Sequence, residues 1–243
     1  MNHYKAPSRA TRDGSHVSWI SDVRGPVRDD HTQLDPQEAN GGNSDRALLD
    51  AFRYTATALI SDNLSRLPGA MGLRPFHALG RTMAGTALTV RTSPGDNLAV
   101  HQALDVVRPG QVIVVDGGGD TSRALIGEIM MNLALSRGAA GFVIDGAVRD
   151  AAALAVSDLP VFARAAFHRG PYKNGPGELN VPISIGGMVV NPGDIVVGDA
   201  DGVVAFSYAT GRDILDAVRV QQQEEAAILK SIRDGTYDAT SCC

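Results

Sequence analysis

The chain has 243 residues, of which 44% are apolar and 20% charged, and its formal net charge of -5 argues against nucleic acid as a main partner. Its two cysteines, Cys242 and Cys243, cannot build a disulfide framework or a cysteine metal site, so we expect a reducing, cytoplasmic setting. The first residues lack the apolar core of a signal peptide, and no apolar run is long enough to predict a membrane-spanning helix.

Residues 1–43 form a polar segment without a sustained hydrophobic period, and a Gly-Gly-Asn-Ser turn signal marks its end. Three of the six histidines, His3, His16 and His31, lie there, so a metal-binding tail is one interpretation. The composition favours a solvated or loosely docked arm instead. We therefore predict a polar N-terminal arm over residues 1–43 and a single α/β domain over residues 44–243.

The domain is predicted to begin with helices and to continue as alternating strands and helices. Ser44 is a suitable helix cap with apolar residues at helical spacing after it, and a second short helix is predicted from Ser61 or Asp62. Further on, near-continuous apolar runs predict strands that are buried on both faces of a sheet. Strands are expected at 86–91, 111–116, 141–145 and 159–164, and helices at 97–106, 127–137 and 151–155.

After residue 165 the pattern changes to short strands between Gly, Pro and Asp turns. A loop is predicted at 170–177, strands at 180–185, 188–190, 194–198 and 202–206, and a long helix at about 211–234. Asp199 and Asp201 lie in a GDADG segment that lacks the remaining positions of a calcium loop, so we interpret them as part of a strand-joining turn.

The dipeptide Arg149-Asp150 is the strongest candidate for chemistry, because it follows a predicted buried strand almost directly. Ligands in α/β sheets bind beyond the carboxyl ends of the strands. An arginine at the carboxyl end of a strand can bind an anion while the neighbouring carboxylate binds a metal. A turn with a surface ion pair is the alternative interpretation.

Two further segments have the form of binding loops. Gly127–Met130 has the pattern of a helix start, whose free N–H groups can bind a substrate carboxylate, although an ordinary helix entry gives the same pattern. Asp116–Asp120 contains three glycines and resembles the first loop of a nucleotide or S-adenosylmethionine fold. Because the G-x-G-x-x-G pattern is absent, we interpret this loop as a tight strand exit.

Four segments together resemble one family, which comprises the regulator of ribonuclease activity A and the 4-hydroxy-4-methyl-2-oxoglutarate aldolases. They are GGGDTSRALIGE, GAAGFVIDGAVRD, GPGELNVPISIGG and PGDIVVGDADGVV. The resemblance implies a compact α/β/α sandwich of the RraA-like, swivelling-domain-like type, with a β-rich second half and a C-terminal helix. It also implies assembly as a homotrimer or hexamer.

The family's signature is an acidic residue, twenty intervening residues and then Arg-Asp, which Glu128, Arg149 and Asp150 match. The resemblance implies that Asp150 binds Mg²⁺ or Mn²⁺ and that Arg149 binds the substrate. The backbone amides that would hold the pyruvyl carboxylate are those of Gly127, Glu128, Ile129 and Met130.

The resemblance also assigns the proton chemistry. Glu128 would orient a water at the metal ion, together with a glutamate from the C-terminal helix of a neighbouring subunit. Glu225 is the nearest match for that glutamate, and Glu224 is the alternative. Ala153 stands where many aldolase members carry an acid, which leaves the exact substrate open, whereas Asp150 favours the enzyme branch over the ribonuclease regulators.

The function so implied is a divalent-metal-dependent, class II lyase that acts on a small 2-oxo acid. It would cleave 4-hydroxy-4-methyl-2-oxoglutarate, or a related 4-hydroxy-2-oxo acid, to pyruvate, and decarboxylate oxaloacetate through the same pyruvate enolate. Lys173 is the one suitable lysine for the other aldolase route, a Schiff base. His101 and His168 lie outside any recognisable catalytic motif, so we expect them to have no part in the chemistry.

Two other classes of function stay open. A non-catalytic regulator that binds a ribonuclease is the main alternative, since one branch of the family has that role. A methyltransferase is the second of these classes, and this hypothesis rests on the glycine loop at residues 117–119 alone.

Overall fold

The computed structural model describes residues 42–66, 69–78 and 80–238. The polar arm predicted at residues 1–43 falls almost entirely outside these residues, so the arm stays a prediction. Within the described ranges, no helix has both the length and the apolar character needed to cross a membrane.

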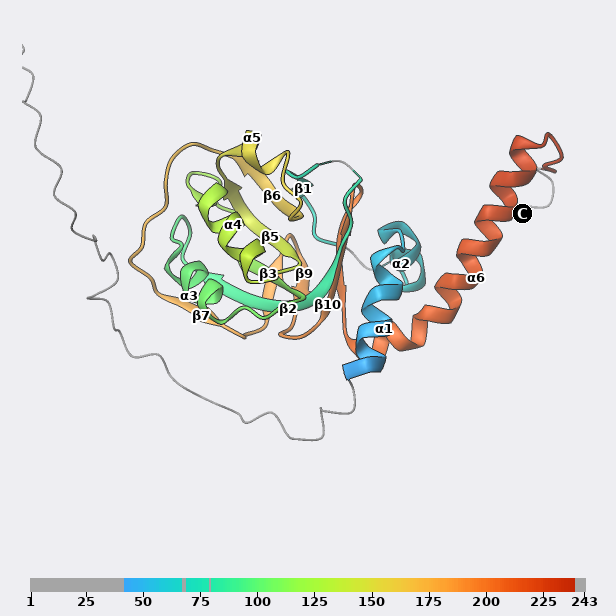
Figure 1. The fold of residues 1–243 in the computed structure, drawn as a ribbon, viewed down its shortest axis with the longest axis horizontal. Helices are drawn as coiled ribbons and strands as arrows, with labels where there is room; N and C mark the ends of the chain where they lie inside the picture. The colour runs from blue at the N-terminus through green and yellow to red at the C-terminus, as the bar shows by residue number, and fades with distance from the viewer. Residues whose placement is uncertain (1–41, 67–68, 79, 239–243) are drawn as a thin grey trace, which may run out of the picture. The chain divides into compact units, whose positions relative to one another are not determined.

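Helices and strands alternate in the first half of the domain, and short strands followed by one long helix make up the second half (Figure 1). The helices are α1 (Gly42–Arg53), α2 (Thr57–Asn63), α3 (Leu98–Val106), α4 (Glu128–Ser136), α5 (Ala151–Leu154) and α6 (Tyr208–Arg233). The strands are β1 (Arg74–Pro75), β2 (Met83–Thr92), β3 (Gln111–Asp116), β4 (Ala124–Ile126), β5 (Gly141–Val148), β6 (Val161–Ala166), β7 (Gly177–Leu179), β8 (Ile183–Ile185), β9 (Met188–Val190), β10 (Ile195–Asp199) and β11 (Gly202–Phe206).

Most of the described strands form one mixed sheet, in the order β1-β6-β5-β3-β2-β10-β11, with β4 beside β5 and β7 beside β2. The apolar strands β2, β3, β5 and β6 pair in parallel, whereas β10 and β11 extend the sheet by antiparallel pairing. The carboxyl ends of the parallel strands therefore meet at one edge, which is where α/β folds bind their ligands.

Successive residues of β3 point to opposite faces of this sheet and pack in different clusters. Ile113 and Val115 pack with residues of α3, α4 and α5. Val112 and Val114 pack with the hairpin β8–β9. The structure thus confirms the mixed α/β fold with a β-rich second half and a C-terminal helix, and it shows that a β-hairpin covers one face of the sheet.

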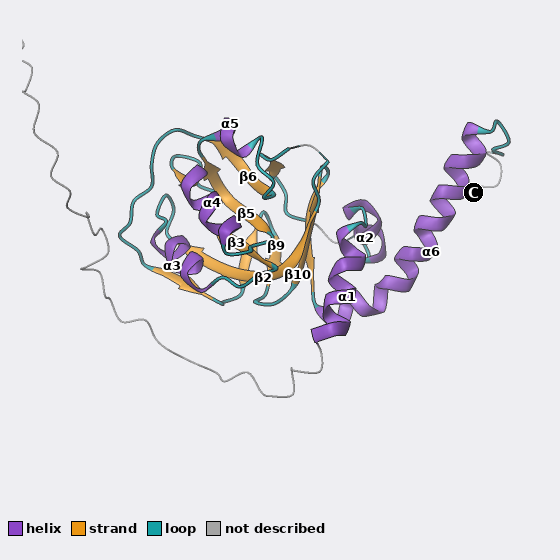
Figure 2. Cartoon of the chain, viewed as in Figure 1, coloured by secondary structure: helices purple, strands orange, loops and turns teal. Residues whose placement is uncertain are grey.

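A third cluster joins α1, α2 and α6 to β10 and β11, the last two strands in the sheet order. Figure 2 shows α1, α2 and α6 on the side of the sheet where β10 lies. Val196 of β10 packs on the hairpin side, whereas its neighbours Ile195 and Val197 pack with these three helices. Since alternate residues of a strand face opposite ways, the three helices cover the face that the hairpin leaves open.

The second helix begins earlier than the predicted start at Ser61 or Asp62. α2 starts at Thr57, because the carboxylate of Asp199 accepts hydrogen bonds from the backbone N–H of Thr57 at 2.8 Å and from its hydroxyl at 2.7 Å. Asp199 lies 142 residues further along the chain, so the local pattern could not reveal this cap. The same residue ends β10 at the turn into β11, as the GDADG segment predicted.

The segment predicted as one strand at 180–185 is divided in the structure. Asn180 takes a left-handed conformation with φ of 54°, so β7 ends before it and β8 begins only at Ile183. The final helix begins at Tyr208, slightly earlier than predicted, because the hydroxyl of Ser207 accepts a hydrogen bond from the backbone N–H of Thr210.

Candidate functional site

Arg149 and Asp150 directly follow β5 at the carboxyl edge of the parallel strands. The backbone N–H of Arg149 donates to the carbonyl of Ile126 at 3.0 Å, which ties the dipeptide to the end of β4. Asp150 takes a left-handed conformation with φ of 58°. Aspartate tolerates this conformation better than most residues, and non-glycine residues held in it gather at functional sites.

The N-terminus of α4 lies against this dipeptide. The backbone N–H of Glu128 donates to Oδ2 of Asp150 at 3.0 Å, so Asp150 satisfies one of the free donors at the start of the helix. The N–H groups of Ile129 and Met130 belong to the same first turn and have no acceptor within the helix. The helix dipole adds positive potential at this end, so the site attracts anions.

Gly127 provides the space that this arrangement needs. A Cβ atom on Gly127 would lie 2.4 Å from Oδ2 of Asp150 and 2.9 Å from Cγ of Arg149. Its φ of -149° is ordinary extended backbone, so glycine is required here by space and not by conformation.

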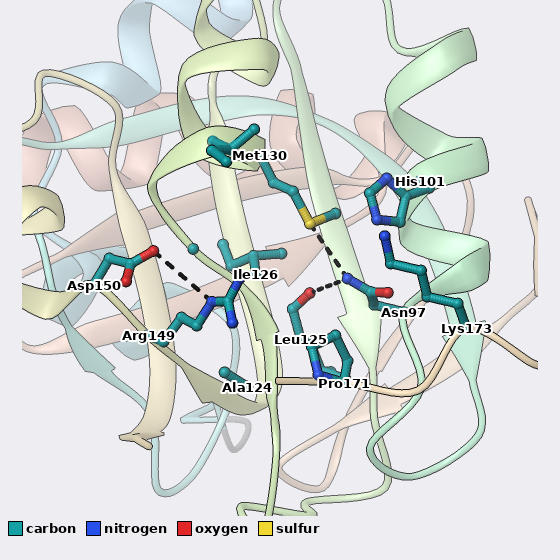
Figure 3. A pocket seen from close by; sticks show the side chains of 12 residues that line it. Asn97, His101, Ala124, Leu125, Ile126, Met130, Arg149, Asp150, Pro171 and Lys173 are labelled. Carbon is teal, nitrogen blue, oxygen red and sulfur yellow. Dashed lines mark hydrogen bonds and ion pairs between the residues drawn. The ribbon is translucent and has the colours of Figure 1, made fainter. Parts of the chain in front are cut away.

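These groups line a cavity of about 170 Å³ that lies at the start of both α3 and α4 (Figure 3). The residues around it are Asn97, His101, Ala124, Leu125, Ile126, Gly127, Ile129, Met130, Arg149, Asp150, Pro171 and Lys173. Pockets for drug-sized ligands are about 300–1,000 Å³, so this volume suits a small organic acid better than a nucleotide-sized cofactor.

The structure brings most of the predicted site residues to this one cavity. Gly127, Ile129, Met130, Arg149 and Asp150 line it. Nε of Arg149 lies 3.9 Å from Oδ2 of Asp150, and each side chain is 44% exposed, so the pair is loose and both groups stay accessible to a ligand. Their chemical roles stay predictions.

Two predicted glutamates have side chains that do not line the cavity of their own chain. Glu128 contributes its backbone N–H to the site, but its side chain is exposed and is not among the lining residues. Glu225 lies on α6, where it accepts a hydrogen bond from Nε2 of Gln221 at 3.0 Å. Since Glu225 was predicted to act on a neighbouring subunit, that role stays a prediction.

The remaining polar residues of the cavity are Asn97, His101 and Lys173. Sequence analysis considered Lys173 only for a Schiff base and His101 only to set it aside, and it missed Asn97. His101 lines the cavity, and the expectation that it has no part in the chemistry stays a prediction. Asn97 precedes α3 and follows the carboxyl end of β2. The strand-end rule that selected Arg149 and Asp150 would therefore have selected Asn97 as well.

The environment of His101 favours its neutral form. Burial lowers the pKa of His101 below its ordinary value of 6.5, and the positive charge of Lys173 lowers it further, while Asp105 acts in the opposite direction. At neutral pH, Lys173 is therefore the cation at this side of the cavity, and His101 is an uncharged neighbour.

The glycine loop at residues 117–119 is a tight strand exit, as predicted. A Cβ atom on Gly117 would lie 2.7 Å from Cδ1 of Leu125 and 2.8 Å from the carbonyl oxygen of Asp145. Gly119 has a positive φ of 72° and packs against the guanidinium of Arg164. Close packing accounts for Gly117 and positive φ for Gly118 and Gly119, and none of the three lines the cavity.

The donor groups fit a hard divalent cation held by one carboxylate. Among the described residues, no three His, Cys, Asp or Glu side chains come together as a metal cage. Of the residues that the structure describes around the cavity, Asp150 alone carries a carboxylate. Mg²⁺ and Mn²⁺ prefer oxygen ligands, and Mg²⁺ keeps several waters, so Asp150 together with two oxygens of a 2-oxo acid is a sufficient donor set.

Comparison with known proteins gives a family and two different functional names. The family model described as RraA-like, Aldolase/RraA, matches residues 57–205. A Halalkalibacterium halodurans protein named "Putative 4-hydroxy-4-methyl-2-oxoglutarate aldolase" is 39% identical to this chain over 184 residues, which are 75% of this chain and 87% of that protein.

Solved structures share the fold. An uncharacterized protein from Pseudomonas syringae pv. tomato is 30% identical with a TM-score of 0.71, over 78% of this chain and 90% of that one. The RNA-processing inhibitor RraA from Thermus thermophilis is 35% identical with a TM-score of 0.57, over 62% of this chain and 92% of that one.

Proposed function

The chain belongs to the RraA-like family, and we propose that it is a divalent-metal-dependent lyase for small 2-oxo acids. Its proposed reaction is the cleavage of 4-hydroxy-4-methyl-2-oxoglutarate, or a related 4-hydroxy-2-oxo acid, to pyruvate. One observation carries the proposal: Arg149 and Asp150 lie together on the wall of a small cavity, against the N-terminus of α4. The name of the Halalkalibacterium relative supports the same reaction class.

The pyruvyl half of such a substrate matches the groups on this wall. Its carboxylate suits the N–H groups of Ile129 and Met130 at the positive end of α4. The guanidinium of Arg149 can bind the carboxylate or the ketone oxygen through paired donors. Asp150 would hold Mg²⁺ or Mn²⁺, which when bound supplies Lewis-acid stabilisation of negative charge on the ketone oxygen.

Cleavage breaks the bond between C3 and C4 and leaves its electron pair on the pyruvyl half as an enolate. Arg149 stabilises the negative charge that develops there. The C4 hydroxyl loses its proton as the second pyruvate forms, and C3 gains a proton to complete the first. Oxaloacetate gives the same enolate when it loses CO₂, so decarboxylation is the expected side activity.

We assign the proton transfers to Glu128 together with Glu225 of a neighbouring subunit, because each carries a carboxylate that can exchange a proton through water. This assignment requires the proposed trimer or hexamer. The second half of α6 supports assembly, since Ile228, Leu229 and Ile232 are 38%, 54% and 51% exposed in the single chain. Exposed apolar side chains of this kind are typical of a surface that another chain covers.

The alternative function is a non-catalytic regulator of a ribonuclease, and the likeness to the Thermus inhibitor favours it. The retained Asp150 favours the lyase, because a protein-binding regulator has no need for a carboxylate held in a left-handed conformation beside a small cavity.

Pyruvate release distinguishes the two functions. With Mg²⁺, we expect the chain to release pyruvate from 4-hydroxy-4-methyl-2-oxoglutarate and from oxaloacetate, and we expect EDTA to abolish both reactions. Asp150→Asn should lower kcat/KM by ~10²–10³-fold or more, because charge stabilisation in the transition state is lost. Asp158→Asn is the control, since Asp158 forms an exposed ion pair with Arg81.

Two results would count against the proposal. A wild-type protein that is inert with several 2-oxo acids favours the regulator. Borohydride trapping of a substrate adduct on Lys173 would instead indicate the Schiff-base route.

A further inference from the structure

The long helix α6 leaves the cover of its own chain near Gln221. Val218 is buried, with an exposed fraction of 1%, and Gln221 is half-buried, whereas residues 222–230 are all exposed. In Figure 1, this second half of α6 extends past α1 and α2. Glu225, to which we assign a proton transfer in a neighbouring chain, lies just beyond the covered part, so its carboxylate needs a contact that holds it.

The side chain of Gln221 provides that contact and joins it to α2. Nε2 of Gln221 donates to Oε1 of Glu225 at 3.0 Å and to Oδ2 of Asp62 at 3.3 Å. Oε1 of Gln221 accepts a hydrogen bond from Nδ2 of Asn63 at 2.7 Å. Nδ2 of Asn63, the last residue of α2, also donates to the carbonyl of Leu59 at 2.9 Å. The carboxylate of Glu225 is thus linked to α2 through two side-chain amides.

The amide of Gln221 fits this place in one orientation only. If its oxygen and nitrogen exchanged positions, the nitrogen would face the Nδ2 donor of Asn63, and the oxygen would face the carboxylates of Asp62 and Glu225. A side-chain NH₂ group has two donors, and those of Gln221 and Asn63 are all used. The N–H bond that is directed at Glu225 is therefore fixed from α2 and not by α6 alone.

Glu224, the other candidate for the proton transfer, lacks this support. The residue one turn before it is Val220, whose side chain has no donor. Successive residues of a helix lie about 100° apart around its axis, so Glu224 cannot share the contact of Glu225 with Gln221. No described residue donates to Oε2 of Glu225, so one oxygen of this carboxylate is held while the other stays available to a water.

We propose that Gln221 and Asn63 are positioning residues for Glu225: they hold Oε1 in place and leave Oε2 to the water of a neighbouring chain's site. This inference rests on the proposed function, because Glu225 has no proton to transfer in a non-catalytic regulator. It selects Glu225 over Glu224, and it makes α2 of one chain part of the site of the next. A group held in its reacting position avoids the loss of rate, ~10²-fold for about 1 Å, that misplacement brings.

Gln221→Met is the first test, since methionine keeps the length of the side chain and removes its hydrogen bonds. With 4-hydroxy-4-methyl-2-oxoglutarate, kcat should fall about 10-fold, which is part of the ~10²–10⁴-fold that a positioned acid or base contributes. KM should change by less than about twofold, because Gln221 does not touch the substrate. Gln222→Met is the matched control, because Gln222 is the exposed neighbour on the same helix, and it should keep both constants.

Asn63→Leu tests the link to α2. Because Asn63 acts through Gln221, the double variant with Gln221→Met should have the same kcat as Gln221→Met alone. Two independent losses would multiply instead, and a kcat equal to that product would overturn the role of Asn63. Thermal melting of the variants separates this coupling from a loss of stability.

The side-chain NH₂ signals of Gln221 report on the contact without turnover. In the NMR spectrum they are the pair that disappears in Gln221→Met. Because Nε2 donates to Glu225, these signals should shift in Glu225→Gln and stay in place in Glu224→Gln. A shift in Glu224→Gln alone would overturn the choice of Glu225.

The positioning inference and the proposed function fail in different ways. If Glu225→Gln loses activity while Gln221→Met keeps the wild-type kcat, the positioning is overturned and the lyase stands. If Gln221→Met lowers kcat and raises KM in proportion to its loss of stability, Gln221 has only a structural role and the inference is wrong. A wild-type protein without lyase activity would overturn the proposed function and this inference with it.

Discussion

At the scale of single residues, the site depends on one position where no side chain can be added without displacing Asp150 and Arg149. Gly127 faces Asp150 and Arg149 at distances where a methyl group cannot fit, and Asp150 holds a conformation that most residues avoid. A small change at either position should therefore alter the chemistry more than it alters the stability of the fold.

Gly127→Ala tests this expectation. The added methyl group would lie 2.4 Å from Oδ2 of Asp150, so the carboxylate and the neighbouring arginine must shift. A displacement of about 1 Å at a reacting group can cost ~10²-fold in rate, and we expect a loss of kcat/KM of that size with a folded protein. Steady-state kinetics and thermal melting would measure the two effects.

Gly193→Ala is the control for Gly127→Ala. Gly193 has a positive φ of 82° and no heavy atom within 4 Å of its added Cβ, so alanine there strains the backbone without touching the site. We expect it to lower stability by about 1 kcal/mol and to leave kcat/KM unchanged. If both variants lose activity in proportion to stability, the steric argument for Gly127 is wrong.

His101 gives a prediction about pH. The folded chain holds its pKa below the unfolded value of 6.5, so the unfolded chain takes up more protons as the pH falls through that value. The contribution of His101 to stability is therefore fully present above pH 6.5 and is lost as the pH falls through the folded pKa.

His101→Gln cannot titrate, so its free energy of unfolding should fall less between pH 8 and pH 5.5. Urea unfolding of the wild-type protein and His101→Gln at both pH values measures this difference. An equal fall in the free energy of unfolding of the two proteins would contradict the burial of an uncharged imidazole.

At the scale of elements, the loop between β6 and β7 is held in place by α3 and the segment before it. Asp96 lies at the centre of that arrangement, because its two carboxylate oxygens accept from the backbone N–H groups of Leu98, Asn174 and Gly175. The loop carries Lys173, so the ordering of the loop and the binding of the ligand should be linked.

Asp96→Asn should loosen this loop selectively. Replacing one oxygen by an NH₂ group puts a donor against backbone donors, which costs roughly 1–3 kcal/mol for a buried group. We expect hydrogen exchange at the amides of Asn174 and Gly175 to accelerate while the amides of β3 and β5 stay protected. Asp158→Asn, which removes an exposed carboxylate, should leave both sets unchanged.

At the scale of the whole molecule, the proposed proton transfer requires two chains. Asp150 and Arg149 belong to the cavity of one chain, while the proposed Glu225 comes from a neighbour. Asp150→Ala and Glu225→Ala should each be inactive alone. When the two variants are unfolded and refolded together, mixed assemblies should contain some sites with both residues intact, and part of the activity should return.

Refolding Asp150→Ala together with Arg149→Ala is the matched control. Both substitutions damage the same wall of the same cavity, so every site in a mixed assembly lacks one of the two residues and no activity should return. Recovery in this control would mean that the two residues act in different cavities. No recovery with Glu225→Ala would mean that Glu225 does not complete the cavity of a neighbouring chain.

The fold and one wall of the site follow from short-range patterns in the sequence. The apolar runs that form β3 and β5 predicted strands buried on both faces of a sheet, and the position of Arg149-Asp150 after such a run predicted a site at the strand ends. The helix start at Glu128 was also predicted, because the apolar pattern and the preceding glycine are local signals. Local backbone preference and burial are sufficient to produce these features, so a single sequence contains them.

Other features depend on contacts between distant parts of the chain, and only the tertiary structure decided them. Asp199 starts α2 from 142 residues away, and Asp96 positions a loop 78 residues further on. The meeting of Asn97, Lys173 and Asp150 in one cavity follows from the same packing. A residue's neighbours along the chain determine its local conformation, whereas the side chains opposite it across a cavity are set by how the sheet and its covering layers pack together.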